Sequence, residues 1–283
     1  MLRTFTATAI ALIGFAANSI ICRLALEAKS IDASSFTVIR LFAGALTLII
    51  ILSTREGSTL RYGKGQWLSA IMLFAYAAAF SFAYNSLEAG TGALILFAAV
   101  QITMILADYV MGNRLSPAEW SGLLCAFSGF VILVLPGFSA PPLMGTLLMV
   151  IAGCAWGSYT LMGRASKNSL VDTTGNLVKS LPFATLLLLA GIPYLEISPS
   201  GILLAIISGS LTTGVIYVVW YVALGGLSIV QSAVVQLLVP VIAAFGGVLF
   251  LAEAISTRLV LSTLMIMGGI LAVVLVRNKP EDI

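Results

Sequence analysis

NRLS at residues 113–116 and EAIS at residues 253–256 mark the same place in a pattern that this chain contains twice. An apolar segment with SGF at residues 128–130 follows the first, and one with GGI at residues 268–270 follows the second. The distance along the chain from NRLS to SGF is the same as the distance from EAIS to GGI. The two apolar segments are therefore equivalent parts of two copies of one pattern. This repeat decides the fold.

The repeat divides the chain into two units of similar length. Upstream of these segments, FAANS at residues 15–19 matches AWGSY at residues 155–159. Residues 136–142 contain a Pro-Gly and a Pro-Pro pair, which are typical of a turn-rich linker. We therefore predict one unit at residues 1–139 and a second at residues 140–283.

Each unit holds five apolar segments of membrane-spanning length, about 20 residues each. An odd number of spans per copy places the second copy upside down relative to the first, and inverted repeats that meet near the middle of the bilayer are typical of secondary transporters. The sequence thus predicts an all-α polytopic membrane protein with ten transmembrane helices, arranged as two inverted five-helix repeats around a central cavity. The expected spans are residues 4–26, 33–53, 66–86, 89–111, 117–135, 142–163, 171–194, 199–224, 226–251 and 257–276.

The composition excludes a water-soluble domain. Of the 283 residues, 60% are hydrophobic and 9% are charged, whereas soluble domains carry roughly 25% charged residues. Backbone groups in lipid must bond internally, and the apolar runs are continuous rather than alternating, so helices are predicted and not a barrel. The lipid bilayer is an expected partner. Nucleic acid is not, because the basic residues form no stripe outside the spans.

The chain offers few groups for catalysis or metal binding. It contains no histidine, and Cys22, Cys125 and Cys154 are isolated within expected spans. We therefore predict no cofactor, no metal site and no enzymatic activity. The alternative of an intramembrane lipid-modifying enzyme would need a nucleophile–base pair, or a carboxylate pair to hold a metal.

Lys and Arg in the loops predict the orientation, since cytoplasmic loops are enriched in them. One side holds Arg3, Arg55, Arg61, Lys64, Arg114, Arg164, Lys167, Arg277 and Lys279, and the other holds Arg23, Lys29 and Arg258. We therefore predict a multi-pass protein of the cell inner membrane with both termini in the cytoplasm.

Polar side chains near the expected span centres are the candidate substrate-binding residues, because they are costly in lipid unless they face a wet cavity or a partner. They are Asn18, Tyr76, Gln101, Trp156, Ser158, Tyr159, Tyr217 and Gln236. The alternative for the amides is a bond between helices, and for serine a bond to its own helix. A wall of Trp and Tyr with polar tips would suit a small amphiphilic ligand, although Trp156 could instead fill the core.

The remaining two basic residues fall well inside expected spans, away from either end. Arg40 lies about two turns into the second span, and Lys179 lies at a similar depth in the seventh. Both could snorkel to the nearest interface. The alternative is a gating role, or a counter-ion for a substrate carboxylate.

Acidic residues are missing from the expected span centres, where proton- or sodium-coupled carriers usually have one. Clustered Lys and Arg, which a phosphate-bearing substrate would need, are missing as well. A polar but nearly uncharged cavity with aromatic walls remains. It suits a zwitterion or a neutral solute with an apolar part that moves down its gradient.

The repeated motifs resemble the drug/metabolite transporter superfamily, in its EamA-like two-repeat branch. Asn113 stands where that family usually has Glu, whereas Glu253 keeps it. The motifs are AGTGA (89–93), MGNRLS (111–116) and GFV (129–131), which recur as SIVQSA (228–233), LAEAIS (251–256) and GIL (269–271).

This resemblance implies a ten-helix basket, termini inside and export of metabolites by alternating access. Around Tyr76 and Trp156 the chain is similar to YddG-type amino-acid exporters. We therefore expect a monomer that passes aromatic or apolar amino acids, such as Phe, Met or Thr, across the inner membrane. The alternatives are a carrier for other small metabolites or drugs, and a channel or importer subunit.

Overall fold

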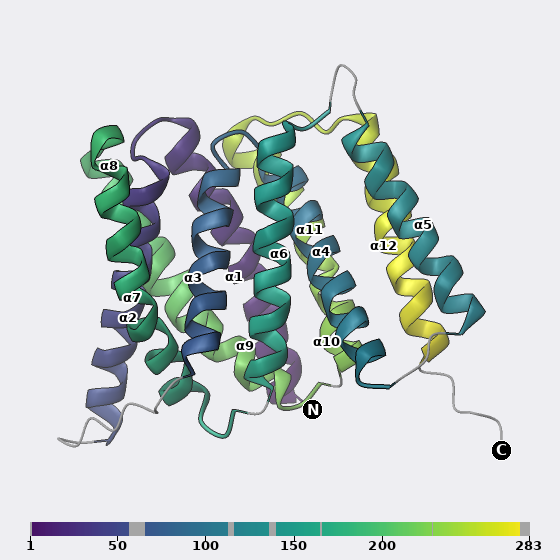
Figure 1. Cartoon of the computed structure of the whole chain (residues 1–283), viewed down its shortest axis with the longest axis horizontal. Helices are drawn as coiled ribbons and strands as arrows, with labels where there is room; N and C mark the ends of the chain where they lie inside the picture. Colours follow the sequence, from purple (N-terminus) through teal and green to yellow (C-terminus); the bar gives the residue numbers. More distant parts are fainter. Residues whose placement is uncertain are drawn as a thin grey trace.

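The computed structural model describes residues 2–56, 66–112, 116–135, 140–164, 166–227 and 229–277, and nearly all of them are helical. Figure 1 shows the helices standing side by side, with α5 and α12 forming a pair at one edge. The elements are α1 (Leu2–Glu27), α2 (Ala33–Glu56), α3 (Trp67–Ala83), α4 (Ala89–Val110), α5 (Pro117–Val134), α6 (Leu143–Gly163), α7 (Ser169–Gly191), η1 (Ile192–Tyr194), α8 (Pro199–Ile207), η2 (Ser208–Val215), α9 (Ile216–Leu224), α10 (Ile229–Gln236), α11 (Leu238–Leu251) and α12 (Thr257–Arg277).

These elements form the ten predicted spans, with α8, η2 and α9 making the eighth and α10 and α11 the ninth. Within the described residues, six helical stretches are long and apolar enough to cross a membrane, and four shorter helices are also apolar. The predicted all-helical membrane fold is confirmed.

The two halves run in opposite directions. α5 and α12, the last spans of the two halves, pack so that Gly122 faces Gly269 and Gly129 faces Met265. Residue numbers thus rise along one helix where they fall along the other. Exchanging the halves also preserves the packing: α3 and α4 both contact α6, and α9 and α11 both contact α1. This is the arrangement that inverted repeats produce.

Two spans in the second half are irregular. η2 is a π-helix of 8 residues in the middle of the eighth span, and π-type turns inside α-helices often occur at functional sites. The ninth span breaks at Leu237. Pro240 explains this break, because proline has no N–H to donate to the carbonyl four residues earlier. Pro182, by contrast, lies inside a continuous α7.

Glycines bring several spans into backbone contact. Gly153 and Gly157 of α6 face α4, where a Cβ at Gly157 would lie 3.2 Å from the Val100 carbonyl oxygen. A Cβ at Gly44 of α2 would likewise lie 2.9 Å from the carbonyl oxygen of Gly209 in η2. Small residues allow this close approach in membrane bundles, so α2 is held directly against the π-helix.

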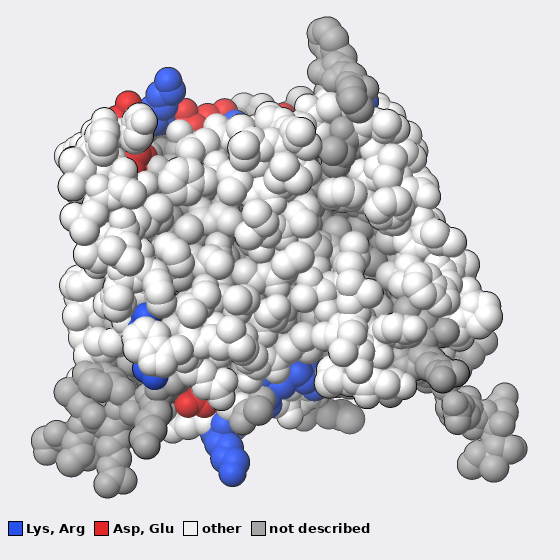
Figure 2. Space-filling view, viewed as in Figure 1, with Lys and Arg blue, Asp and Glu red and all other residues white. Residues whose placement is uncertain are grey.

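Charged side chains gather at the two ends of the bundle, and an apolar belt separates them (Figure 2). We call the end at which α1 begins the N-terminal end, and the other the far end. In the view of Figure 2 the acidic residues lie mainly at the far end. A wide uncharged belt between two charged rims is what a lipid-embedded protein requires.

Some sequence-based expectations concern residues outside the described ranges. They are the boundary between residues 139 and 140, the departure from the family pattern at Asn113, and the loop charges at Arg61, Lys64, Arg114 and Lys279.

Candidate functional site

Aromatic side chains from both halves meet in the interior of the bundle. Each of them is at most 7% exposed. Four of the predicted site residues are therefore brought together, two from α6 and one each from α3 and α9. We call this set the aromatic cluster: Phe15, Tyr76, Trp156, Tyr159, Tyr217, Trp220 and Tyr221.

Trp156 is the centre of the aromatic cluster. Its ring centroid lies 4.9 Å from that of Tyr76 and 4.8 Å from that of Tyr217. Phe15 meets it edge-on at 5.4 Å. These separations fall in the favourable range for aromatic pairs. The cluster's own side chains thus occupy the place where the sequence predicts a cavity, so the centre is occluded in this structure.

Asn18 joins the aromatic cluster to the π-helix. Its Nδ2 donates to the Tyr76 hydroxyl at 3.2 Å, and its Oδ1 accepts from the hydroxyls of Ser208 and Thr212, both at 2.8 Å. Ser208 and Thr212 both lie in η2. This predicted residue therefore makes the interhelical bonds that the sequence left as the alternative, and it also contacts a residue of the cluster.

Gln236 bonds the other side of the aromatic cluster. Its Oε1 accepts from Trp156 Nε1 at 3.4 Å, while its Nε2 donates to the Ser232 carbonyl at 2.8 Å. It ends α10, just before the break at Leu237. Gln101 is also fully buried, near the middle of α4.

Several polar tips of the aromatic cluster have no hydrogen-bond partner. The hydroxyls of Tyr159 and Tyr217 and Nε1 of Trp220 are buried with none among the described residues. Tyr159 does interact electrostatically with Tyr221, Asn176 and Thr173, and Tyr217 with Tyr76 and Thr213, but none of these contacts has hydrogen-bond geometry. Unsatisfied buried donors cost about 1–3 kcal/mol each. The cluster is therefore an apolar surface with spare hydrogen-bonding capacity, which is what a small amphiphilic ligand needs.

Ser158 lies away from the aromatic cluster. Its hydroxyl donates to the Cys154 carbonyl of its own helix at 2.9 Å. The reason is helical geometry, since a residue two positions after Trp156 points about 200° away from it. The structure therefore does not bring Ser158 together with the other candidates.

The two predicted charged residues have different surroundings. Lys179 is half-buried, with its Nζ 5.1 Å from the ring of Trp67 at the start of α3. Arg40 is completely buried, and its guanidinium lies 5.8 Å from the ring of Tyr76. Only Arg40 borders the aromatic cluster.

Several residues in or near the cluster were not among the predicted site residues, and Trp220 and Tyr221 of the cluster itself are two of them. Phe15 contacts Trp156 from α1, and Thr173 and Asn176 face Tyr159 from α7. The start of α7, SLVDTTGN, is unusually polar for a span, and this was the available signal for the last two. Phe15 gave none, because a phenylalanine in an apolar span is ordinary.

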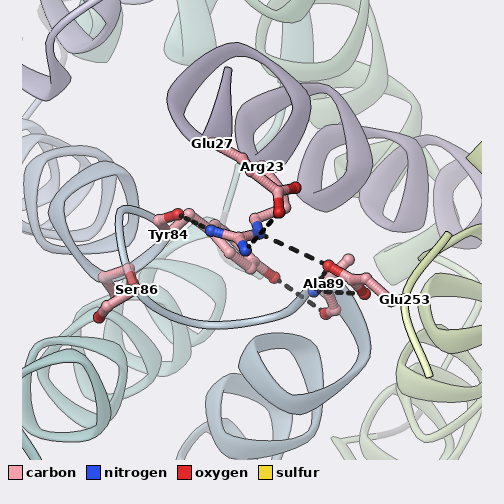
Figure 3. Close-up of polar contacts among 7 residues, drawn as sticks. Arg23, Glu27, Tyr84, Ser86, Ala89 and Glu253 are labelled. Atoms are coloured by element: carbon pink, nitrogen blue, oxygen red, sulfur yellow. Dashed lines mark hydrogen bonds and ion pairs between the residues drawn. The ribbon is translucent and has the colours of Figure 1, made fainter. Parts of the chain in front are cut away.

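A network of polar bonds ties the two halves together at the far end (Figure 3). Both carboxylate oxygens of Glu253 accept from the backbone N–H of Ala89, at 2.9 and 3.0 Å. Arg23 Nε lies 3.5 Å from Glu253, while Nη2 pairs with Glu27 at 3.0 Å and Nη1 donates to the Tyr84 carbonyl at 3.2 Å. We call Arg23, Glu27, Tyr84, Ala89 and Glu253 the far-end clasp.

The environment of the far-end clasp perturbs its central carboxyl. Burial raises the pKa of Glu253 above its ordinary value, although the Ala89 N–H and the Arg23 charge oppose the shift. Glu88 and Glu27 raise it further. The Glu253 carboxylate is thus held at an energetic cost, which its bond to the first N–H of α4 partly offsets.

At the N-terminal end, Arg164 occupies the position in the second half that Arg23 occupies in the first. Arg164 follows α6 and donates to the Leu227 carbonyl at 3.0 Å and to the Ser232 hydroxyl at 3.3 Å. Burial lowers its pKa. Arg23 bonds the end of the third span and Arg164 the end of the eighth, so the two arginines are related by the repeat.

A cavity of about 500 Å³ opens at the far end. Its rim carries Lys29, Asp32 and Glu196, and Phe82 adds an apolar surface. Phe82 lies six residues beyond Tyr76 on α3, about 9 Å along the helix. The cavity therefore approaches the aromatic cluster from the far end without reaching it.

Known proteins resemble the chain in both sequence and fold. The EamA-like transporter family matches residues 3–135 and again residues 143–275. An uncharacterized protein of Pseudomonas aeruginosa is 49% identical over 95% of this chain and 93% of its own. The uncharacterized transporter YoaV of Bacillus subtilis is 22% identical over 83% of this chain and 85% of its own. A crystal structure with 21% sequence identity shares the fold with a TM-score of 0.66, covering 97% of this chain and 98% of that chain.

Proposed function

The chain belongs to the EamA-like transporter family, and we propose that it carries amino acids with aromatic or apolar side chains out of the cell, in the manner of YddG-type exporters. It is a membrane transporter and not an enzyme, as the names of its relatives indicate. In this proposal it lies in the inner membrane with both termini in the cytoplasm, and one chain is sufficient because both halves of the site come from it.

The observation that carries this proposal is the aromatic cluster, where the two inverted halves meet. Carriers built from inverted repeats bind substrate near the middle of the bilayer between the repeats. Trp156, in contact with Tyr76, Tyr217 and Phe15, offers a flat apolar surface for a substrate side chain. The unbonded tips of Tyr159, Tyr217 and Trp220 offer hydrogen bonds to its polar end.

In this proposal, the buried amide side chains orient the bound substrate. Asn18 and Gln236 each bond a ring of the aromatic cluster, so a substrate that displaces these bonds meets one donor and one acceptor on each side. Gln101 contributes a third buried amide. An ammonium and a carboxylate need this mixture of acceptors and donors.

In this proposal, alternating access results from separate sets of bonds that close the two ends of the bundle. The far-end clasp closes one end through Arg23 and Glu253, and Arg164 closes the other through Leu227 and Ser232. Opening either end in turn would expose the cluster to one side at a time. Since the acids in the described spans lie at their ends, passage down the substrate gradient is the simplest driving force.

Uptake of labelled phenylalanine, methionine or threonine into proteoliposomes tests the proposal. Saturable flux that the other amino acids compete with is expected. Trp156→Ala should lower flux per folded protein at least tenfold, because the substrate loses its central aromatic contact. Trp120→Ala is the matched control, since Trp120 is 50% exposed on α5. Absence of competable flux for all three amino acids would refute the proposal.

The same assay separates the second candidate, a carrier of other small metabolites or drugs. An aromatic surface with neutral polar tips also suits uncharged aromatic solutes. If such solutes competed and amino acids did not, the family-level function would stand and the amino-acid assignment would fall. Conductance without saturation would instead indicate a channel.

A further inference from the structure

Arg40 is a fully buried cation inside the helical bundle. It lies on α2, seven residues after Ala33, which is about 10 Å from the start of the helix. Its exposed fraction is 0%. A snorkelling arginine keeps its charged head in water or headgroups, so snorkelling does not describe this residue.

Among the described residues, the guanidinium of Arg40 makes a single hydrogen bond. Nη2 donates to the Ala77 carbonyl at 2.8 Å, whereas Nε and Nη1 have no partner. The ion pairs of Arg23 with Glu27 and Glu253 do not include Arg40. Most of the donors of this buried cation are therefore unused.

Aromatic rings surround the rest of the guanidinium. Its central carbon lies 5.7 Å from the centroid of Phe36, 5.8 Å from that of Tyr76 and 5.3 Å from that of Phe80. Such contacts attract a cation only weakly compared with a paired anion. They exclude water, which strengthens the electrostatic interaction with any anion that enters.

A buried charge without a counter-ion is strongly unfavourable, and intramembrane arginines are kept where they act on a substrate or a partner. Resting on the proposed function, we infer that Arg40 binds the carboxylate of the transported amino acid. A carboxylate supplies the two acceptor oxygens that the free guanidinium donors require. The substrate class is thereby narrowed to small carboxylates that carry an apolar group.

The position of Arg40 relative to the aromatic cluster fits this assignment. Tyr76 touches both, since its ring lies 5.8 Å from the Arg40 guanidinium and 4.9 Å from the Trp156 ring. A carboxylate on Arg40 would thus place an adjoining side chain against Trp156. Asn18, bonded to the Tyr76 hydroxyl, would lie beside the substrate's ammonium.

The backbone holds Arg40 in place. A Cβ at Gly209 of η2 would collide with the Arg40 carbonyl oxygen, so the two backbones are in direct contact. Thr212 of the same π-helix bonds Asn18. The π-helix therefore positions both polar groups that would meet the two ends of an amino acid.

Three ligands that share one ring separate the contributions of the two charged groups: phenylalanine, 3-phenylpropionate, which lacks the ammonium, and phenethylamine, which lacks the carboxylate. Binding to purified protein in detergent is followed through tryptophan fluorescence, since Trp156 and Trp220 lie in the cluster. The variants are Arg40→Gln and Arg40→Lys. Lys179→Gln, which removes a second cation that lies well inside a described span but does not border the cluster, is the control.

The wild-type protein should bind phenylalanine and 3-phenylpropionate more tightly than phenethylamine. Arg40→Gln should weaken the first two about 10- to 100-fold and leave phenethylamine unchanged, because a hydrogen-bonded charge pair is lost. Arg40→Lys should retain part of the affinity, and Lys179→Gln all of it. A second readout is the melting temperature: a substrate-binding arginine can be neutralised without lowering it, whereas a structural one cannot.

Equal wild-type binding of phenylalanine and phenethylamine would overturn the inference, as would unchanged phenylalanine binding in Arg40→Gln. So would a large drop in melting temperature with all three affinities reduced together. These results differ from failure of the proposed function. Arg40-dependent binding of 3-phenylpropionate without amino-acid flux would keep the carboxylate site and remove the amino-acid substrate.

Discussion

The hydrogen bonds of Asn18 hold the π-helix against α1, and the structure predicts how much stability the protein loses when they are removed. Asn18→Ala deletes one bond to Tyr76 and one each to Ser208 and Thr212. Interhelical bonds in membrane proteins contribute about 0.6 kcal/mol on average, so roughly 2 kcal/mol should be lost. This corresponds to a melting temperature about 4–8 °C lower.

The assay is a double-mutant cycle with Thr212→Val, which removes the hydroxyl and keeps the shape. If the 2.8 Å bond from Thr212 to Asn18 contributes as expected, the double variant should be less destabilised than the sum of the singles, by about 0.6 and at most 1.7 kcal/mol. Ser158→Ala is the control, because Ser158 bonds only its own helix and should add independently. Additive behaviour of Asn18 and Thr212 would refute the role assigned to this bond.

The far-end clasp and the packing of α2 give two further predictions. Because burial raises the pKa of Glu253, the folded protein holds that proton more tightly than the unfolded chain, so stability should rise as the pH falls from the raised value to the ordinary one. Glu253→Gln should abolish this component of a melting-temperature profile, and Arg23→Gln should extend it to higher pH; identical profiles for all three proteins would contradict the assignment. Gly209→Val should destabilise the protein by several kcal/mol, because its Cβ meets the rigid Arg40 carbonyl. Gly268→Val, which has open space beside it, should have little effect in the same melting assay, and equal loss in both would exclude the backbone contact as the cause.

The helices could be predicted from the sequence because lipid leaves so few alternatives. Continuous apolar runs of membrane-spanning length must be helices, and the expected third span, residues 66–86, differs from α3 (Trp67–Ala83) only at its ends. The breaks were harder to predict. Pro240 offered a signal for the interruption at Leu237. The π-helix at Ser208–Val215 packs against α1 and α2, and these contacts join residues that are distant in the sequence.

The sequence indicated which types of residue form the candidate site, but it did not indicate which of them contact one another. Trp156, Tyr76 and Tyr217 were chosen as aromatic residues in spans, and the structure shows that they touch one another. Ser158 was chosen as a polar residue near the centre of its expected span, and helix rotation places it away from the cluster. Arg23 was read only as a far-side charge, since its contact with Glu253 joins residues that are distant in the sequence.

The two ends of the bundle explain how a nearly symmetric protein can favour one conformation. If the two repeats were identical in sequence, a two-fold rotation would convert the state that is open at one end into the state that is open at the other. The two states would then have equal energy. Arg23 faces the carboxylate of Glu253 at 3.5 Å, whereas the position equivalent to Glu253 in the first half is Asn113. At the N-terminal end, Arg164 bonds the neutral Leu227 carbonyl and Ser232 hydroxyl. An ion pair with a charge-assisted bond to a helix N-terminus is stronger than bonds to neutral acceptors. We therefore expect the far end to be the more firmly closed of the two, so that a substrate leaving by that end must first break the far-end clasp.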